Sequence, residues 1–138
     1  LITFTEDSLL GLAAKVGEPG ADGVDGRAAC GQIVWLALQF AQANPGMVRV
    51  LVGDALVFEQ ARLTERVGLL FEKLEAVLRA HWRHWAGQQG LATPTADAQV
   101  RAALLLIYLR GVLHAFVRSD WKHLPTQGSD AHLETLLG

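Results

Sequence analysis

The longest periodic segment of the chain, residues 54–86, carries apolar side chains at steps of four and three residues. Its main stripe consists of Leu56, Leu63, Val67, Leu70, Leu74 and Val77. This spacing places side chains on one face of an α-helix, which has about 3.6 residues per turn. A second stripe contains Phe71, Leu78, Trp82 and Trp85. The segment is therefore predicted to form one long helix with two apolar stripes and a charged face between them.

Other segments show the same helical period. Residues 1–16, 27–43 and 94–121 are predicted to be helices, with shorter ones at about 45–52 and 129–138. Apolar positions nearly surround 27–43 and 94–121, so both helices must be covered on more than one side. The glycine-rich stretch 17–26, the stretch 87–90 and Pro125 separate the helices. The 138 residues are therefore predicted to form one all-α domain of about six helices.

The ends of the helices have recognisable signals. Asn44 before Pro45, and Thr93 before Pro94, are typical of an N-cap followed by proline at the first helical position. Gly53 can close the short helix at 45–52. The predicted cap of 54–86 is Asp54, and the predicted cap of 129–138 is Ser129 or Asp130.

The composition indicates more apolar surface than a monomer of this size hides. Hydrophobic residues make up 51% of the chain, and charged residues only 19%, against about 25% in typical domains. An obligate dimer would account for the excess, because such interfaces resemble a domain core cut in half.

Charge and cysteine content limit the possible functions. The net charge is −2 and the twelve Lys and Arg residues are scattered, so we expect no DNA binding by this segment itself. Cys30 is the only cysteine, which favours a reducing compartment. The longest apolar run, residues 102–109, is too short to span a bilayer. The chain opens without Met inside a predicted helix, so we expect a fragment or a trimmed domain.

No residue pattern indicates catalysis, a metal site or a cofactor. His81 and His84 lie one turn apart, but no third ligand follows at metal-site spacing, and an aromatic cluster at a surface or dimer edge is the simpler interpretation. Asp22 and Asp25 match neither a calcium loop nor a phosphate loop. Cys30 is interpreted as a small apolar residue.

Two stretches carry a family resemblance. "QANPGMVRVLVGDALVFEQARLTERVGLLFEKLEAVLR" (42–79) and "GVLHAFVRSDWKHLPT" (111–126) closely resemble the SlmA family of TetR-like nucleoid occlusion factors, and "FTEDSLL" (4–10) resembles the start of that family's regulatory domain. The resemblance implies a TetR-type C-terminal domain whose helix-turn-helix domain is absent from this chain. It also implies a cytoplasmic, nucleoid-associated parent protein that binds DNA and antagonises assembly of the division protein FtsZ.

The resemblance implies a groove for the FtsZ C-terminal tail, between the first helix and the buried helix 27–43. Phe4, Leu36 and Asn44 match groove residues of the family by position. Ala43 and Leu12 stand where the family commonly has basic residues, so this groove has less positive charge to meet an acidic peptide.

The predicted homodimer pairs the two long helices with their symmetry mates in a four-helix bundle. The predicted interface consists of Leu74, Leu104, Ile107, Gly111 and Ala115. Gly111 and Ala115 are small residues four apart, which also fits a tight helix crossing inside one monomer.

A second hypothesis is a small-molecule-sensing domain of a TetR-type transcriptional repressor. Its apolar pocket would be lined by Trp35, Met47, Phe58, Tyr108 and His114. An enclosed pocket of several hundred Å³ would favour this hypothesis, whereas a core filled by side chains would favour protein recognition.

Overall fold

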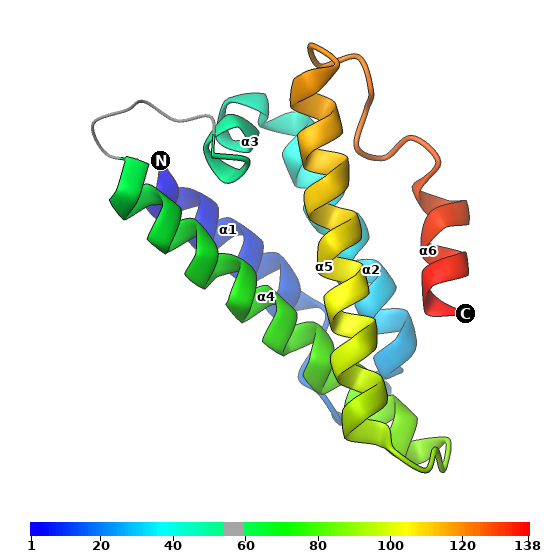
Figure 1. Cartoon of the computed structure of the whole chain (residues 1–138). Coiled ribbons are helices and arrows are strands. Elements are labelled where there is room, and N and C mark those ends of the chain that lie inside the picture. Colours follow the sequence, from blue (N-terminus) through cyan, green and yellow to red (C-terminus); the bar gives the residue numbers. More distant parts are fainter. Residues whose placement is uncertain (54–59) are drawn as a thin grey trace.

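The computed structural model describes residues 1–53 and 60–138, and within them every regular element is an α-helix (Figure 1). The helices are α1 (Ile2–Lys15), α2 (Gly26–Ala43), α3 (Pro45–Leu51), α4 (Gln60–Gln88), α5 (Pro94–Arg118) and α6 (Ser129–Leu137). The predicted all-α class and the order of the helices are confirmed. Residues 54–59, where Asp54 was the predicted cap and the long helix was predicted to begin, lie outside the described residues.

Helix α2 is the centre of the domain and packs against each of the other five helices. Its buried residues include Cys30, Val34 and Leu38, which are at most 1% exposed. In Figure 1, α1 runs beside α4, α5 crosses α4, and α6 lies at the far edge next to α2 and α5. The prediction of a central, buried helix at 27–43 is therefore confirmed. Because α2 packs against both α1 and α6, it contributes to one surface shared with α1 and another shared with α6.

The capping predictions are partly wrong. Pro45 and Pro94 do open their helices, but neither Asn44 nor Thr93 makes a side-chain capping bond. Asn44 Nδ2 instead donates to the carbonyl of Phe40 at 2.8 Å, inside the preceding helix. The residue before α6 is Gly128 with φ +72°, so Ser129 and Asp130 are helical residues and not caps.

A cap that the sequence did not single out begins α2. The Asp25 carboxylate accepts from the backbone N–H of Arg27 at 2.9 Å and of Ala28 at 3.2 Å. These two bonds satisfy N–H groups that have no partner inside the helix. Asp25 therefore has a structural role at the end of the glycine-rich loop.

Helix α5 ends at Arg118, three residues before the predicted end at 121. Asp120 and Trp121 have φ of +56° and +68°, in the left-handed region. The Trp121 N–H donates to the Phe116 carbonyl at 2.9 Å, a bond that closes a helix C-terminus. The edge-on contact of the Trp121 and Phe116 rings, 5.0 Å apart at their centroids, holds this turn in place.

Candidate functional site

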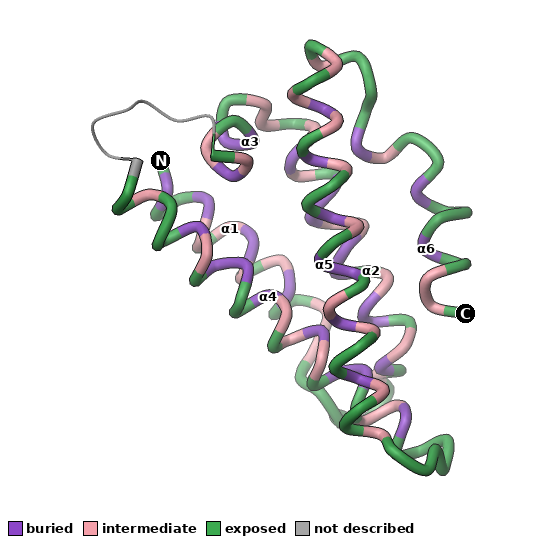
Figure 2. The backbone as a smooth tube through the Cα atoms, in the orientation of Figure 1, coloured by how far each residue is buried: buried purple, intermediate pink, exposed green. Residues whose placement is uncertain are grey.

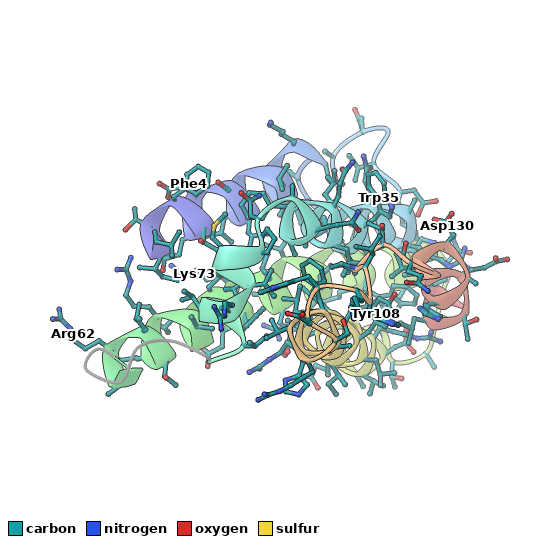
Figure 3. All side chains as sticks on the ribbon, turned by 90° about the horizontal axis from the view of Figure 1, so that it is seen from above. Phe4, Trp35, Arg62, Lys73, Tyr108 and Asp130 are labelled. Atoms are coloured by element: carbon teal, nitrogen blue, oxygen red, sulfur yellow. The ribbon has the colours of Figure 1, made fainter. Side chains whose placement is uncertain are left out.

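The predicted FtsZ groove residues lie on α1, on α2 and at the turn after α2. Phe4 is 57% exposed on α1, and its ring lies 6.3 Å from the ring of Phe40 on α2, measured between centroids. Leu36, which lies one turn before Phe40, and Leu12 on α1 are both half-buried. Ala43 is exposed. Figure 3 shows Phe4 at the outer edge of α1. We call Phe4, Leu12, Leu36, Phe40, Ala43 and Asn44 the α1–α2 surface.

The chemistry of the α1–α2 surface is aromatic and uncharged. None of its six residues carries a charge. The Asn44 amide is turned back to the Phe40 carbonyl, which fixes the exit of the chain from α2. The surface therefore offers apolar contact area to a partner and no fixed cation. Phe40 was not among the predicted groove residues, and its contact with Phe4 joins segments 36 residues apart in the sequence.

Polar contacts hold α1 in its place beneath this surface. Arg66 Nη2 of α4 binds Glu6 Oε1 at 2.6 Å and Thr3 Oγ1 at 3.1 Å. On the other side, the Thr5 hydroxyl donates to the Met47 sulfur of α3 at 2.6 Å. Sequence reasoning missed both links, because their partners lie about 40 to 60 residues apart. They set the position from which Phe4 meets solvent.

Helix α5 presents an apolar stripe to solvent. Val100, Leu104 and Ile107 are 59%, 42% and 66% exposed, at steps of four and three residues. Gly111 and His114 follow at the next steps of four and three residues and are also exposed. Figure 2 shows exposed segments recurring along α5. We call these five residues the α5 stripe. Large apolar side chains that share one exposed helix face are typical of an interaction surface.

The structure separates the predicted dimer residues into two groups. Leu104, Ile107 and Gly111 are exposed, and Ala115 is half-buried. Leu74 is 2% exposed and belongs to the core of the monomer, so it is not available to a partner. A Cβ added to Gly111 would meet none of the described residues within 4 Å, so the described helices make no tight crossing at Gly111 inside the monomer.

The residues of the predicted small-molecule pocket are not brought together. Trp35 lies between α2 and α6, Met47 is buried against Thr5, and Tyr108 binds His132 across the α5–α6 contact. Phe58 lies outside the described residues. Of the four described residues of the predicted pocket, only His114 lines the cavity of about 510 Å³ between α3, α4 and α5.

That cavity has the volume of a small-molecule site, but the described residues enclose it only in part. Its walls include Leu51, Phe71 and Leu113, with Arg110 and His114 at its polar side. Among the described residues the cavity is partly open, and it adjoins Gly53, which directly precedes the undescribed residues 54–59, and Gly111 of the α5 stripe. An enclosed pocket buries most of its ligand's surface, which an open hollow does not.

Within the described parts of the chain, no residues are arranged to support a metal site or a reactive nucleophile. No three His, Cys, Asp or Glu residues within 1–53 and 60–138 are grouped to hold a metal ion. Burial raises the pKa of the Cys30 thiol to about 12, and its sulfur donates to the Leu78 carbonyl at 3.3 Å. Cys30 therefore stays a thiol at neutral pH and packs as a small apolar residue, as expected.

His81 is fully buried, which corrects its assignment to a surface aromatic cluster. The side chain is 0% exposed, and neither ring nitrogen has a hydrogen-bond partner among the described residues. Trp82 is also buried, at 2%, and its indole N–H donates to Asp97. Burial lowers the pKa of His81, although the nearby Gly17 backbone and Glu18 act in the opposite direction and His84 adds to the lowering.

This buried histidine predicts a loss of stability in mild acid. Because the pKa of His81 is lower in the folded state than the usual 6.5, the unfolded chain binds more protons below that pH. This contribution to stability is therefore fully present above about pH 6.5 and is lost progressively as the pH falls below it. Urea unfolding at pH 7.5 and 5.5 measures this, and His81→Leu should flatten the difference.

The control for this prediction is His123→Gln, since His123 is exposed. This variant should keep the pH dependence of the wild type. A histidine proton resonance that titrates at a lower pH than those of the exposed histidines would be the matching NMR signature of His81. An unchanged pH dependence in His81→Leu would contradict the assignment.

The domain thus has six described helices, with α2 at their centre and an exposed apolar stripe on α5. A family model described as the tetracyclin repressor-like, C-terminal domain, of SlmA-like type, matches residues 27–137. The chain belongs to this family of SlmA-like, TetR-like C-terminal domains.

The curated relatives share one name. Nucleoid occlusion factor SlmA of Vibrio cholerae is 38% identical over 132 residues, which cover 96% of this chain and 65% of the relative. The proteins of the same name from Klebsiella pneumoniae and Escherichia fergusonii are each 41% identical over 131 residues, covering 95% of this chain and 64% of each relative. The chain therefore spans a little under two thirds of the length of these relatives.

Proposed function

We propose that this chain is the dimerisation and FtsZ-binding part of a DNA-bound nucleoid occlusion factor that acts in the cytoplasm at the nucleoid. The observation that carries the proposal is the α1–α2 surface, where an exposed Phe4 meets Phe40 on a chain related to SlmA. The function is recognition: a surface binds the C-terminal tail of FtsZ, and no bond is made or broken. It needs no cofactor.

The binding mode follows from the composition of this surface. Ala43 and Leu12 offer no cation, so the FtsZ tail is held by apolar contacts to Phe4, Leu36 and Phe40. Salt screens charge pairs but not apolar burial. The affinity should therefore depend little on ionic strength.

The α5 stripe supports a homodimer. Burying Val100, Leu104 and Ile107 against a second copy would remove the largest run of exposed apolar side chains on α5 from water. Gly111, with open space above it, lets the partner's backbone approach closely at the same stripe. Two copies of α4 and α5 would then form a four-helix bundle.

The same dimer face accounts for the apolar character of α5. By length and composition α5 could cross a bilayer, since its most apolar window has a mean hydropathy of 1.7. One such helix is weak evidence for a membrane span, because core helices of soluble proteins pass the same test. Its inner face packs on α2 and α4, and we assign its outer face to the second copy.

We assign DNA binding to a part of the parent protein outside residues 1–138. The net charge of −2 and the dispersed cations provide no basic face for phosphates. Helix α1 would couple DNA binding to FtsZ binding. The Arg66–Glu6 pair links α1 to α4, and α4 belongs to the proposed bundle.

A pull-down with purified FtsZ tests the choice of partner. The immobilised chain should retain full-length FtsZ but not FtsZ that lacks its C-terminal tail. Retention should persist when the salt concentration is raised from 50 to 300 mM, because the contacts are apolar. Equal retention of the truncated FtsZ, or of neither form, would contradict the proposal.

A further inference from the structure

A groove of about 420 Å³ lies between α2 and α6, away from the α1–α2 surface. Its walls include Gly31 and Trp35 of α2 and Asp130, Leu133, Glu134 and Leu137 of α6. The absence of a side chain at Gly31 lets Leu137 of α6 pack closely on α2, because an added Cβ would lie 2.8 Å from Leu137 Cδ1. Figure 3 shows Trp35 and Asp130 at neighbouring edges of these helices.

Helix α6 is fixed on both sides of this groove, so the groove exists before any partner arrives. Tyr108 Oη of α5 lies 3.0 Å from His132 Nδ1. Arg27 Nε of α2 donates to the Leu137 carbonyl at 2.9 Å, and Arg101 of α5 donates to the Leu136 carbonyl. These two arginines also lie over the rings of Trp85 and Trp82, which limits their motion. Preformed sites lose less conformational entropy on binding.

The groove combines an apolar floor with a negative rim. Trp35 and Leu137 are half-buried and Leu133 is buried, so they offer contact area but little room for polar groups. Asp130 and Glu134 are exposed, one turn apart on α6. In the described parts of the chain neither carboxylate has an ion-pair partner. The negative end of the α6 dipole already attracts Arg27 and Arg101.

We propose that the α2–α6 groove binds a short cationic, amphipathic segment of a partner protein. A Lys or Arg of that segment lies between Asp130 and Glu134, and an adjacent apolar side chain packs on Trp35. Charge complementarity selects a cationic partner over an acidic one. The groove is widely open to solvent, which suits a peptide segment, whereas small molecules favour enclosed pockets.

This site is independent of the proposed FtsZ contact. It lies on the α6 side of α2, whereas Phe4 approaches α2 from the α1 side. The loss of one activity would therefore leave the other intact. A variant at Phe4 serves to distinguish them.

Selection from a phage-displayed library of 16-residue peptides on the wild-type chain tests the proposal. The enriched peptides should carry two or more Lys or Arg residues within one or two turns of an aromatic or aliphatic residue. In fluorescence anisotropy, Asp130→Asn combined with Glu134→Gln should weaken a selected, labelled peptide at least tenfold. Trp35→Ala should also weaken it.

The matched control neutralises two exposed carboxylates elsewhere, in Asp7→Asn combined with Asp22→Asn. This control and Phe4→Ala should bind the peptide as the wild type does. Circular dichroism should confirm that each variant remains helical. The proposal is overturned if no peptide is enriched, if enrichment shows no preference for cations, or if neutralising Asp130 and Glu134 leaves the affinity unchanged.

Discussion

Gly26→Ala is expected to lower the free energy of unfolding by about 3 kcal/mol or more, because the new methyl group would collide with backbone. A Cβ at Gly26 would lie 2.0 Å from the His81 carbonyl oxygen and 3.0 Å from Trp85 Cβ. The backbone of α4 cannot move away as a flexible side chain would. The first turn of α2 must therefore separate from α4, and urea unfolding measures the loss.

Gly11→Ala is the matched control for this change. Gly11 lies in α1, and an added Cβ there would meet nothing within 4 Å. Alanine is a better helix former than glycine, so Gly11→Ala should be neutral or stabilising by up to about 1 kcal/mol. Equal effects of the two substitutions would show that α2 does not rest on α4 at His81.

Ile107→Glu is expected to dissociate the proposed dimer while leaving the monomer folded. Ile107 is 66% exposed in the monomer, so a carboxylate there remains in water. In the dimer the same carboxylate would be buried without a partner, which costs several kcal/mol. About 3 kcal/mol corresponds to a dissociation constant roughly 100-fold higher. Light scattering should therefore shift from twice the chain mass of 14.9 kDa toward the single mass.

Leu91→Glu makes the same substitution away from the stripe. Leu91 is 41% exposed in the turn between α4 and α5, close to the exposure of Leu104 in the stripe. This variant should keep the mass of the wild type. Gly111→Arg, which fills the open space on the stripe, should give monomers or aggregates. A stable dimer in both Ile107→Glu and Gly111→Arg would contradict the assigned interface.

Periodicity was enough to predict the helices but not the partner of each apolar face. Leu74 and Ile107 both lie in helical stripes of apolar residues, yet Leu74 packs in the monomer and Ile107 faces solvent. The spacing within one helix carries no information on which face a neighbouring helix covers. In the same way, His81 follows an exposed alanine, and the loop before α2 is what buries it.

The contacts that shape the two candidate sites could not be predicted from local sequence. Arg66 meets Glu6, and Arg27 meets the Leu137 carbonyl, 60 and 110 residues away along the chain. Such pairs depend on how α1 and α6 pack, which no turn or cap signal encodes. The α1–α2 surface was predicted through family resemblance, whereas the α2–α6 groove had no sequence signal.

Calorimetric titration of the folded chain with a peptide of the FtsZ C-terminal tail tests the central claim most directly. One peptide should bind per protomer, and Phe4→Ala should weaken binding at least tenfold without loss of helix. Leu124→Ala, which truncates an exposed apolar residue outside the α1–α2 surface, should bind as the wild type does. No binding by a well-folded wild-type dimer, or equal binding by Phe4→Ala, would contradict the account.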